Sequence, residues 1–351
     1  MVASSSPGWS TSKSLDNPRL RHPGRTLLNI TRRQICIAAC AAALFTAALA
    51  RAQAKYPAKP VKFIVPFAPG GGTDAMARVI AQKLNERHGY TVVVDNRAGA
   101  GGNLGAEAAL REPADGYTFL VISSSYTVNA LLNKPSFDPL TAIEPVVQFS
   151  REPVVLAVGM NTPYKTVAEL IDSAKQNPDK VAFGSSGNGG LAHLAAEYFN
   201  ALAGIRITHV PYKGTGAALM DLASGQIQML MAGNTSFTAL AKAGKVRLLA
   251  VGAPQRLATL PNVPTFAEAG MPRYRADIWH GVVAARGTPR DIITKVNADV
   301  NAVLQSAEMQ ARFTQDDIIG AGGTPQQFGE TIRSDIERWR TVVKQSNIKI
   351  E

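Results

Sequence analysis

Short apolar segments alternate with amphipathic segments along most of this 351-residue chain, and this alternation constrains its fold more than any other feature. The apolar segment VKFIVPF, residues 61–67, is typical of a buried strand, and residues 75–89 then place Ala77 and Leu84 on one face of a helix. The same pairing recurs as far as residues 246–252. Apolar strands separated by helices predict parallel sheets covered on both faces, and therefore an α/β fold.

The C-terminal part departs from this rhythm and indicates a discontinuous domain. An apolar strand at residues 279–285 is followed by two helical stretches, 289–313 and 325–346, each preceded by a threonine suited to cap a helix. A chain that builds one α/β unit, then a second, and then returns through a strand crosses twice between lobes, which predicts a hinge that can close a cleft. The predicted lobes are residues 55–153 plus 277–351 and residues 154–276.

Residues 1–54 have the features of a secretory signal peptide with a long lead-in. An Arg-Arg pair ending at Arg33 precedes the apolar run 35–49, and small residues suit cleavage after Ala52 or Ala54. The run is shorter than the about 20 residues that a membrane-spanning helix needs. The arginine pair resembles a twin-arginine export signal, and the general secretory route is the alternative. We expect export to the periplasm.

This leader carries more than half of the formal net charge of +11, a value that by itself would suggest nucleic-acid binding. The leader has seven basic residues and one acidic residue, a net charge of +6, so the remainder carries +5 without a basic cluster. Both cysteines, Cys36 and Cys40, also lie in the leader. The exported chain is therefore expected to bind no nucleic acid and to lack disulfides, thiolate metal sites and cysteine nucleophiles.

A glycine-rich turn, PFAPGGGTD at residues 66–74, joins a strand to a helix and raises the question of nucleotide binding. It lacks the Gly-Lys-Ser/Thr of a P-loop, so it has no lysine for a terminal phosphate. A second turn, RAGAGGNLG at residues 97–105, comes closer to a dinucleotide fingerprint, but the nearest acid, Asp115, precedes the next strand. Both turns lack residues that nucleotide binding requires, and we therefore expect the protein to bind no nucleotide and no other cofactor.

The same turns suit a carboxylate ligand. Glycines allow backbone N–H groups to point at an anion, and the start of a helix adds partial positive charge. A third turn, FGSSGNGG at residues 183–190, repeats the arrangement, and Ser123 and Ser124 add hydroxyls at the end of another strand. Three such turns in a two-lobe chain favour an anion-binding cleft over plain strand-to-helix connections.

Catalytic patterns are scarce in this chain. The histidines have no spacing typical of a metal site, so we expect no metal. Ser186 lies in GSSGN, which lacks the final glycine of a nucleophile elbow. His193, near the start of the following helix, is the candidate base, so a hydrolase or isomerase using Ser186 and His193 is the alternative function. Asp74 is interpreted as a first-turn acid that complements the helix dipole.

Taken together, the motifs resemble those of the Bug-type solute-binding receptors of tripartite tricarboxylate transport systems. The resemblance covers about Tyr56 to Ile350 and rests on PFAPGGGTDAMAR, VVVDNRAGAGGNLGAE, PADGYTFL, VAELIDSAKQNP, HVPYKGTGAALMDLASGQI and LPNVPTFAEAG. It implies a two-lobe periplasmic binding protein of the type II, Venus-flytrap kind, with a mostly parallel sheet flanked by helices in each lobe. It further implies a monomeric, non-catalytic receptor that captures a small organic carboxylate for uptake or sensing. The implied partners are membrane subunits of such a transporter, or a sensor.

In such receptors backbone amides, hydroxyls and bridging waters hold the ligand. The family usually has serine or threonine where this chain has Gly190, and an acid where it has Gly233, so a hydroxyl and a negative charge are missing at these two places. By motif, the resemblance assigns ligand contacts to Phe67, Pro69, Gly70, Gly71, Thr73, Asp74, Ser186, Gly187, Gly189, Gly190, His193, Tyr212, Lys213 and Asn234, and the strand-end hydroxyls add Ser123 and Ser124.

Overall fold

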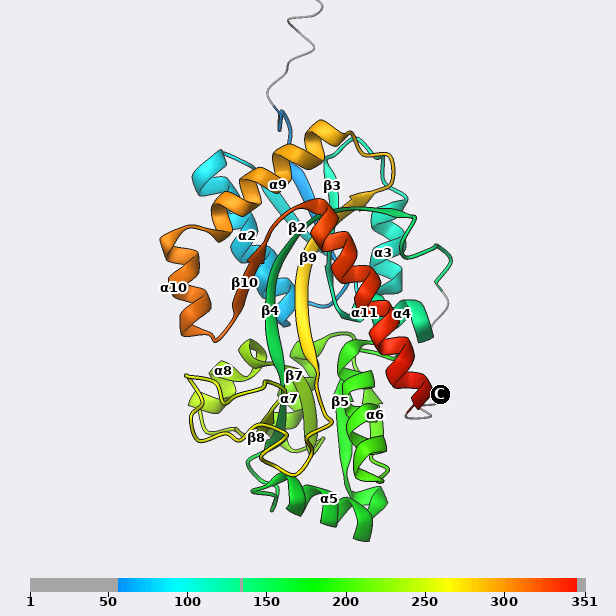
Figure 1. The fold of residues 1–351 in the computed structure, drawn as a ribbon, viewed down its shortest axis with the longest axis vertical. Helices are drawn as coiled ribbons and strands as arrows, with labels where there is room; N and C mark the ends of the chain where they lie inside the picture. Colours follow the sequence, from blue (N-terminus) through cyan, green and yellow to red (C-terminus); the bar gives the residue numbers. More distant parts are fainter. Residues whose placement is uncertain (1–55, 133–134, 346–351) are drawn as a thin grey trace, which may run out of the picture. The chain divides into compact units, whose positions relative to one another are not determined.

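The computed structural model describes residues 56–132 and 135–345, so the predicted signal peptide and its cleavage sites lie outside the described residues. Within this part the chain has the predicted α/β fold (Figure 1). The strands are β1 (Val61–Val65), β2 (Val92–Asn96), β3 (Thr118–Ser123), β4 (Ile143–Gly159), β5 (Ala182–Ser185), β6 (Thr208–Pro211), β7 (Met229–Gly233), β8 (Val246–Val251), β9 (Asp277–Ala285) and β10 (Ile319–Gly322).

Helices follow most strands, as the alternating pattern predicts. None of the described helices is long and apolar enough to cross a membrane. The helices are α2 (Gly72–His88), α3 (Asn103–Leu110), α4 (Ser125–Leu132), α5 (Val167–Gln176), α6 (Leu191–Ala203), α7 (Thr215–Ser224), α8 (Asn234–Lys242), α9 (Arg290–Leu304), α10 (Ala307–Gln315) and α11 (Pro325–Gln345), with short 3₁₀ turns η1 (Ala100–Gly102) and η2 (Pro178–Lys180).

The strands form two groups that share β4, which extends through both of them in Figure 1. The first group has the order β2-β1-β3-β9-β4 with β10 also on β4, and the second has the order β4-β7-β5-β6 with β8 also on β4. Strands β1, β2 and β3 pair in parallel, and so do β5, β6 and β7, whereas β4 and β9 run antiparallel to all of their partners. Strand β8, although part of the alternating pattern, pairs antiparallel with β4. Between Pro153 and Val154, β4 changes its partner from β9 to β7. Residues 55–351 form one compact unit, so the lobe boundaries stay a prediction.

Both faces of each group of strands are buried. In β1, Phe63 and Ile64 face different apolar cores, and in β4 the neighbours Val154 and Val155 do the same. Successive side chains of a strand point to opposite faces, so a strand buried on both sides must be apolar at every position. This is the physical reason for the continuous apolar segments in the sequence.

Two expectations for the C-terminal part are wrong in detail. The helical stretch predicted over residues 289–313 is broken between α9 and α10, because Ser306 caps α10 by accepting a hydrogen bond from Met309 N–H. Thr324 caps α11 as predicted, whereas the Thr288 hydroxyl donates to a carbonyl oxygen of the preceding strand. Strand β10 was not predicted, because its four residues, IGAG, show no apolar pattern.

Candidate functional site

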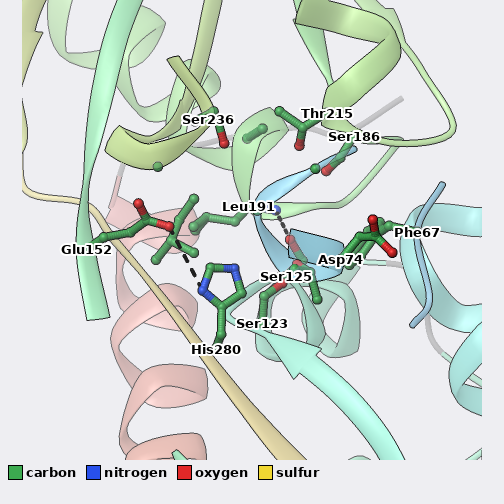
Figure 2. Close-up of a pocket in the computed structure, with 17 residues that line it drawn as sticks. Phe67, Asp74, Ser123, Ser125, Glu152, Ser186, Leu191, Thr215, Ser236 and His280 are labelled. Carbon is green, nitrogen blue, oxygen red and sulfur yellow. Dashed lines mark hydrogen bonds and ion pairs between the residues drawn. The ribbon is translucent and has the colours of Figure 1, made fainter. Parts of the chain in front are cut away.

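The starts of five helices, α2, α4, α6, α7 and α8, surround one small cavity of about 40 Å³ (Figure 2). The first N–H groups of a helix have no partner within the helix and carry partial positive charge, so this arrangement favours an anion. The lining residues are Phe67, Gly71, Gly72, Thr73, Asp74, Ser123, Ser125, Glu152, Ser186, Leu191, Ala192, Thr215, Ala232, Gly233, Ser236, Ile278 and His280.

Glycine occupies the N-cap position of four of these helices, and none of the four glycines can supply a capping side chain. By contrast, Thr166 before α5 and Ser306 before α10, which do not line the cavity, cap their helices with their own hydroxyls. The helices around the cavity therefore keep N–H groups that their own cap residues do not satisfy. The glycine caps are Gly71, Gly190, Gly214 and Gly233.

Hydroxyl groups supply most of the polar side chains in the cavity. A hydroxyl can both donate and accept a hydrogen bond, so it can serve a carboxylate or a neutral polar group. Ser125 already accepts a hydrogen bond from Leu191 N–H at 3.0 Å, and so caps α6 from a different helix. Neither lysine nor arginine is among the described lining residues. The lining hydroxyls belong to Thr73, Ser123, Ser125, Ser186, Thr215 and Ser236.

Asp74 lines the cavity, but its carboxylate mainly ties α2 to neighbouring segments. It accepts hydrogen bonds from Gly70 N–H at 3.1 Å, Arg78 Nε at 3.0 Å and Asn96 Nδ2 at 2.9 Å. Burial raises the pKa of Asp74, but the hydrogen bonds and the charge of Arg78 together hold this pKa below its ordinary value. Asp74 is therefore an ionised, paired acid of the first helical turn, the role inferred for it from the sequence.

Glu152 of β4 and His280 of β9 form another side of the cavity, and neither was assigned to the site from the sequence. Glu152 Oε2 accepts hydrogen bonds from Thr235 N–H at 3.0 Å and from Thr235 Oγ1 at 2.8 Å. Glu152 Oε1 lies 3.9 Å from His280 Nδ1, and each of the two side chains is 3% exposed. Burial raises the pKa of Glu152 to about 7, although the bonds from Thr235 oppose this, and burial lowers the pKa of His280 to about 4.

His193 does not line the cavity and is not paired with Ser186. Its Nδ1 accepts a hydrogen bond from Gly189 N–H at 3.2 Å, and its Nε2 lies 4.0 Å from a carboxylate oxygen of Glu197. The ring of His193 stacks on that of His209 with 3.7 Å between the ring centroids. Both ring nitrogens of His193 thus face other partners, and its visible role is to hold the third glycine turn in place.

We expect this histidine pair to make the fold sensitive to acid. Burial lowers the pKa of His193 to about 4 and, with His193 beside it, that of His209 to about 3, below the ordinary 6.5. As the pH falls, the unfolded chain therefore takes up protons first, and stability present above pH 6.5 is lost toward pH 4. Melting temperatures between pH 7.5 and 4.5 should fall less steeply for His209→Gln than for the wild type. If the melting temperatures of the variant and the wild type fell equally with pH, the histidine pair would not be the cause of the acid sensitivity.

Six residues assigned from the sequence line the cavity together, although they come from distant parts of the chain. The residues missed from the sequence include Ser125, Thr215 and Ser236, which lie in the first turns of their helices. A search for hydroxyls at helix starts would have found them. Glu152 also had a signal, because it is an acid directly before the apolar segment PVVLAVG. The six that line the cavity are Phe67, Gly71, Thr73, Asp74, Ser123 and Ser186.

The other assigned residues lie outside the lining and connect the turns around it. Tyr212 donates to an Asp221 carboxylate oxygen at 2.6 Å, Asn234 donates to a main-chain carbonyl at 2.9 Å, and the Lys213 carbonyl accepts from Ala68 N–H at 3.1 Å. Ser124 is fully buried. The assigned residues that the structure places outside the lining are Pro69, Gly70, Ser124, Gly187, Gly189, Gly190, His193, Tyr212, Lys213 and Asn234.

The fold is that of a periplasmic binding protein, as solved structures show. The periplasmic binding protein BugD is 31% identical, with a TM-score of 0.80 over 84% of this chain and 100% of that chain. Rpa4515 of R. palustris with adipate is 38% identical, with a TM-score of 0.81 over 84% of this chain and 99% of that chain. MatC from Rhodopseudomonas palustris with bound malate is 29% identical, with a TM-score of 0.78 over 82% and 100% of the two chains.

A comparison of the sequence with models of protein families identifies the family. Residues 76–348 match the family described as the tripartite tricarboxylate transporter family receptor. This chain belongs to that family of solute-binding receptors, which confirms the resemblance seen in its motifs.

Proposed function

We propose that this protein is an extracytoplasmic receptor that captures a small organic carboxylate in the cavity formed by Phe67, Gly72, Ser186, Glu152, His280 and their neighbours. The observation that carries this proposal is the convergence of five helix starts, four of them with glycine caps, on one polar cavity. The similar proteins solved with adipate and with malate support a carboxylate ligand.

The ligand would be held without a basic side chain. Carboxylate oxygens would accept hydrogen bonds from N–H groups at the starts of α2 and α7 and from the hydroxyls of Ser186 and Thr215. Each charge-assisted bond of this kind contributes roughly 1.5–3 kcal/mol. Because N–H groups at helix starts are already oriented, they lose little freedom on binding.

Capture would depend on closure of the two predicted lobes, residues 55–153 with 277–351 and residues 154–276. In the structure, contacts join segments of both lobes around the cavity. Ala68 N–H donates to the Lys213 carbonyl oxygen at 3.1 Å, and a side chain at Gly101 would overlap the Asn188 carbonyl oxygen. Gly101 also has a φ of +63°, which favours glycine. The ligand would favour this closed arrangement through contacts that an open one lacks.

The receptor would act in the periplasm after removal of its signal peptide, as a monomer, and would deliver its ligand to transporter membrane subunits or to a sensor. It would carry out no chemistry of its own and bind no nucleotide, nucleic acid or metal. The geometry of Ser186 and His193 supports this choice over a hydrolase or isomerase, because His193 is engaged by Gly189 and His209.

A thermal-shift screen of the purified protein tests the proposal. Mono- and dicarboxylates of three to six carbons should raise the melting temperature, because a ligand at 100 times its dissociation constant adds about 2.7 kcal/mol of stability. The ligand should be recovered unchanged after long incubation, as measured by NMR. Stabilisation by ATP or NAD but by no carboxylate, or conversion of the ligand, would refute the proposal.

A further inference from the structure

The carboxyl group of Glu152 occupies the space that a side chain at Gly233 would need. A Cβ atom built on Gly233 would overlap Glu152, and its three nearest atoms all belong to that carboxyl group. Gly233 has φ −62° and ψ 150°, a conformation that any residue adopts. Glycine is therefore required here by Glu152 and not by the backbone, and the carboxyl group beside position 233 comes from β4.

One oxygen of this carboxyl group, Oε2, caps helix α8. Gly233 is the N-cap residue of α8 and has no side chain to cap it. Glu152 Oε2 does so instead, since it accepts hydrogen bonds from the N–H and the hydroxyl of Thr235. The positive end of α8 favours negative charge at this position.

The other oxygen, Oε1, is directed toward the cavity. Its distance of 3.9 Å from His280 Nδ1 is beyond hydrogen-bond range, and that nitrogen lies closer, at 3.4 Å, to Ser150 Oγ. Asp74, the other acid of the lining, is held by Gly70, Arg78 and Asn96. In Figure 2, Glu152 and Asp74 lie at opposite sides of the cavity, with His280 and Ser125 between them. Glu152 Oε1 is thus a buried acceptor placed across the cavity from the start of α2.

We propose that Glu152 Oε1 determines ligand specificity by accepting a hydrogen bond from a hydroxyl or ammonium group on the carbon next to the ligand's carboxylate. This inference rests on the proposed function. A buried acceptor without a donor is costly, so a ligand that supplies the donor is favoured over one that does not. The cavity is small, about 40 Å³, so the donor must be close to the carboxylate.

Two sets of acids with matched carbon skeletons measure this preference. The sets are succinate, malate and aspartate, and propionate, lactate and alanine. Within the set that the site accommodates, calorimetry on the wild type at about pH 8.5, above the pKa of about 7 of Glu152, should show a hydroxy or amino acid binding at least about tenfold more tightly than the unsubstituted acid. Comparison of the hydroxy with the amino member shows which donor is preferred.

Variants at positions 152 and 233 separate ligand recognition from helix capping. Glu152→Gln keeps the shape and one acceptor but presents an amide donor to the ligand. The variant should therefore bind the substituted and the unsubstituted acid with about equal affinity. Glu152→Ala with Gly233→Asp returns a carboxylate to the same space and should restore the preference. Glu152→Ala with Gly233→Ser is the matched control: serine caps α8 and restores the melting temperature, but the preference should stay lost.

The outcomes distinguish this inference from the proposed function. Tighter binding of the unsubstituted acid, or a preference that survives in Glu152→Gln, overturns the role of Glu152 while the receptor function stands. A preference restored equally by serine and by aspartate at position 233 overturns it as well, because helix capping would then be sufficient. Failure of the wild type to bind any carboxylate overturns both.

Discussion

Replacing Gly72 with valine should strongly weaken carboxylate binding and leave the protein folded. Gly72 is the first residue of α2, lines the cavity and does not have a left-handed φ. A Cβ atom at this position would lie 3.6 Å from Ser236 Oγ and 3.7 Å from His280 Nε2, which are ordinary contact distances. A methyl group therefore fits against the walls without strain, but it takes space from a cavity of only about 40 Å³.

A graded pair of variants gives this prediction its control. Overfilling a packed site costs about 1–3 kcal/mol, and each 1.4 kcal/mol is a factor of ten in affinity. Gly72→Ala should weaken binding about tenfold and Gly72→Val about a hundredfold or more, as measured by calorimetry with the tightest carboxylate from the screen. Their unfolding midpoints in urea should stay close to the wild-type value. A valine variant with wild-type affinity would place the ligand elsewhere.

Replacing Asp335 of α11 with leucine should cost roughly 2–4 kcal/mol of folding free energy, because it removes a buried carboxylate on which buried donors depend. Asp335 is 6% exposed, and its Oδ2 accepts hydrogen bonds from Thr127 Oγ1 at 2.6 Å and from Trp279 Nε1 at 3.2 Å. Its Oδ1 accepts from Arg338 Nη2 at 2.7 Å. Leucine would leave the buried Trp279 N–H without an acceptor and remove one of the carboxylates that Arg338 pairs with.

The reason for so large an effect is that this carboxylate joins three elements. Thr127 belongs to α4 and Trp279 to β9, next to His280, while α11 lies beside α4 and β4 in Figure 1. Asp335→Asn keeps an acceptor and should cost about 1–2 kcal/mol. Glu337→Ala removes an exposed pair with Arg340 on the same helix and should cost less than about 1 kcal/mol. Equal urea midpoints for Asp335→Leu and Glu337→Ala would contradict the proposed role.

Local sequence patterns predicted the fold well where neighbours in the chain are also neighbours in space. The segment VKFIV became β1, and the helix that follows it begins within PFAPGGGTD. A strand, its helix and the next parallel strand are one local unit, so periodicity and turn residues are sufficient to identify them. The prediction was weaker for β4 and β9, whose antiparallel pairing joins residues far apart in the chain.

The glycine turns show the same limit at the site. Their composition indicated an anion site, and Gly71, Thr73 and Ser186 do line one cavity. The sequence could not place Glu152 and His280 side by side, because they lie in strands β4 and β9, whose pairing joins residues far apart in the chain. Only the paired strands β4 and β9 bring the two side chains to within 3.9 Å of each other.

Position 233 shows most clearly what the sequence determines and what the tertiary structure adds. From the sequence, the family resemblance implies that an acid is missing at Gly233. The tertiary structure supplies an acid from another strand, since Glu152 both fills the empty space and caps α8. Chain composition and periodicity determine which elements form and which turns can bind an anion. The packing of β4 against β7 and α8 decides which acidic group lines the cavity, because that group comes from a residue distant in sequence.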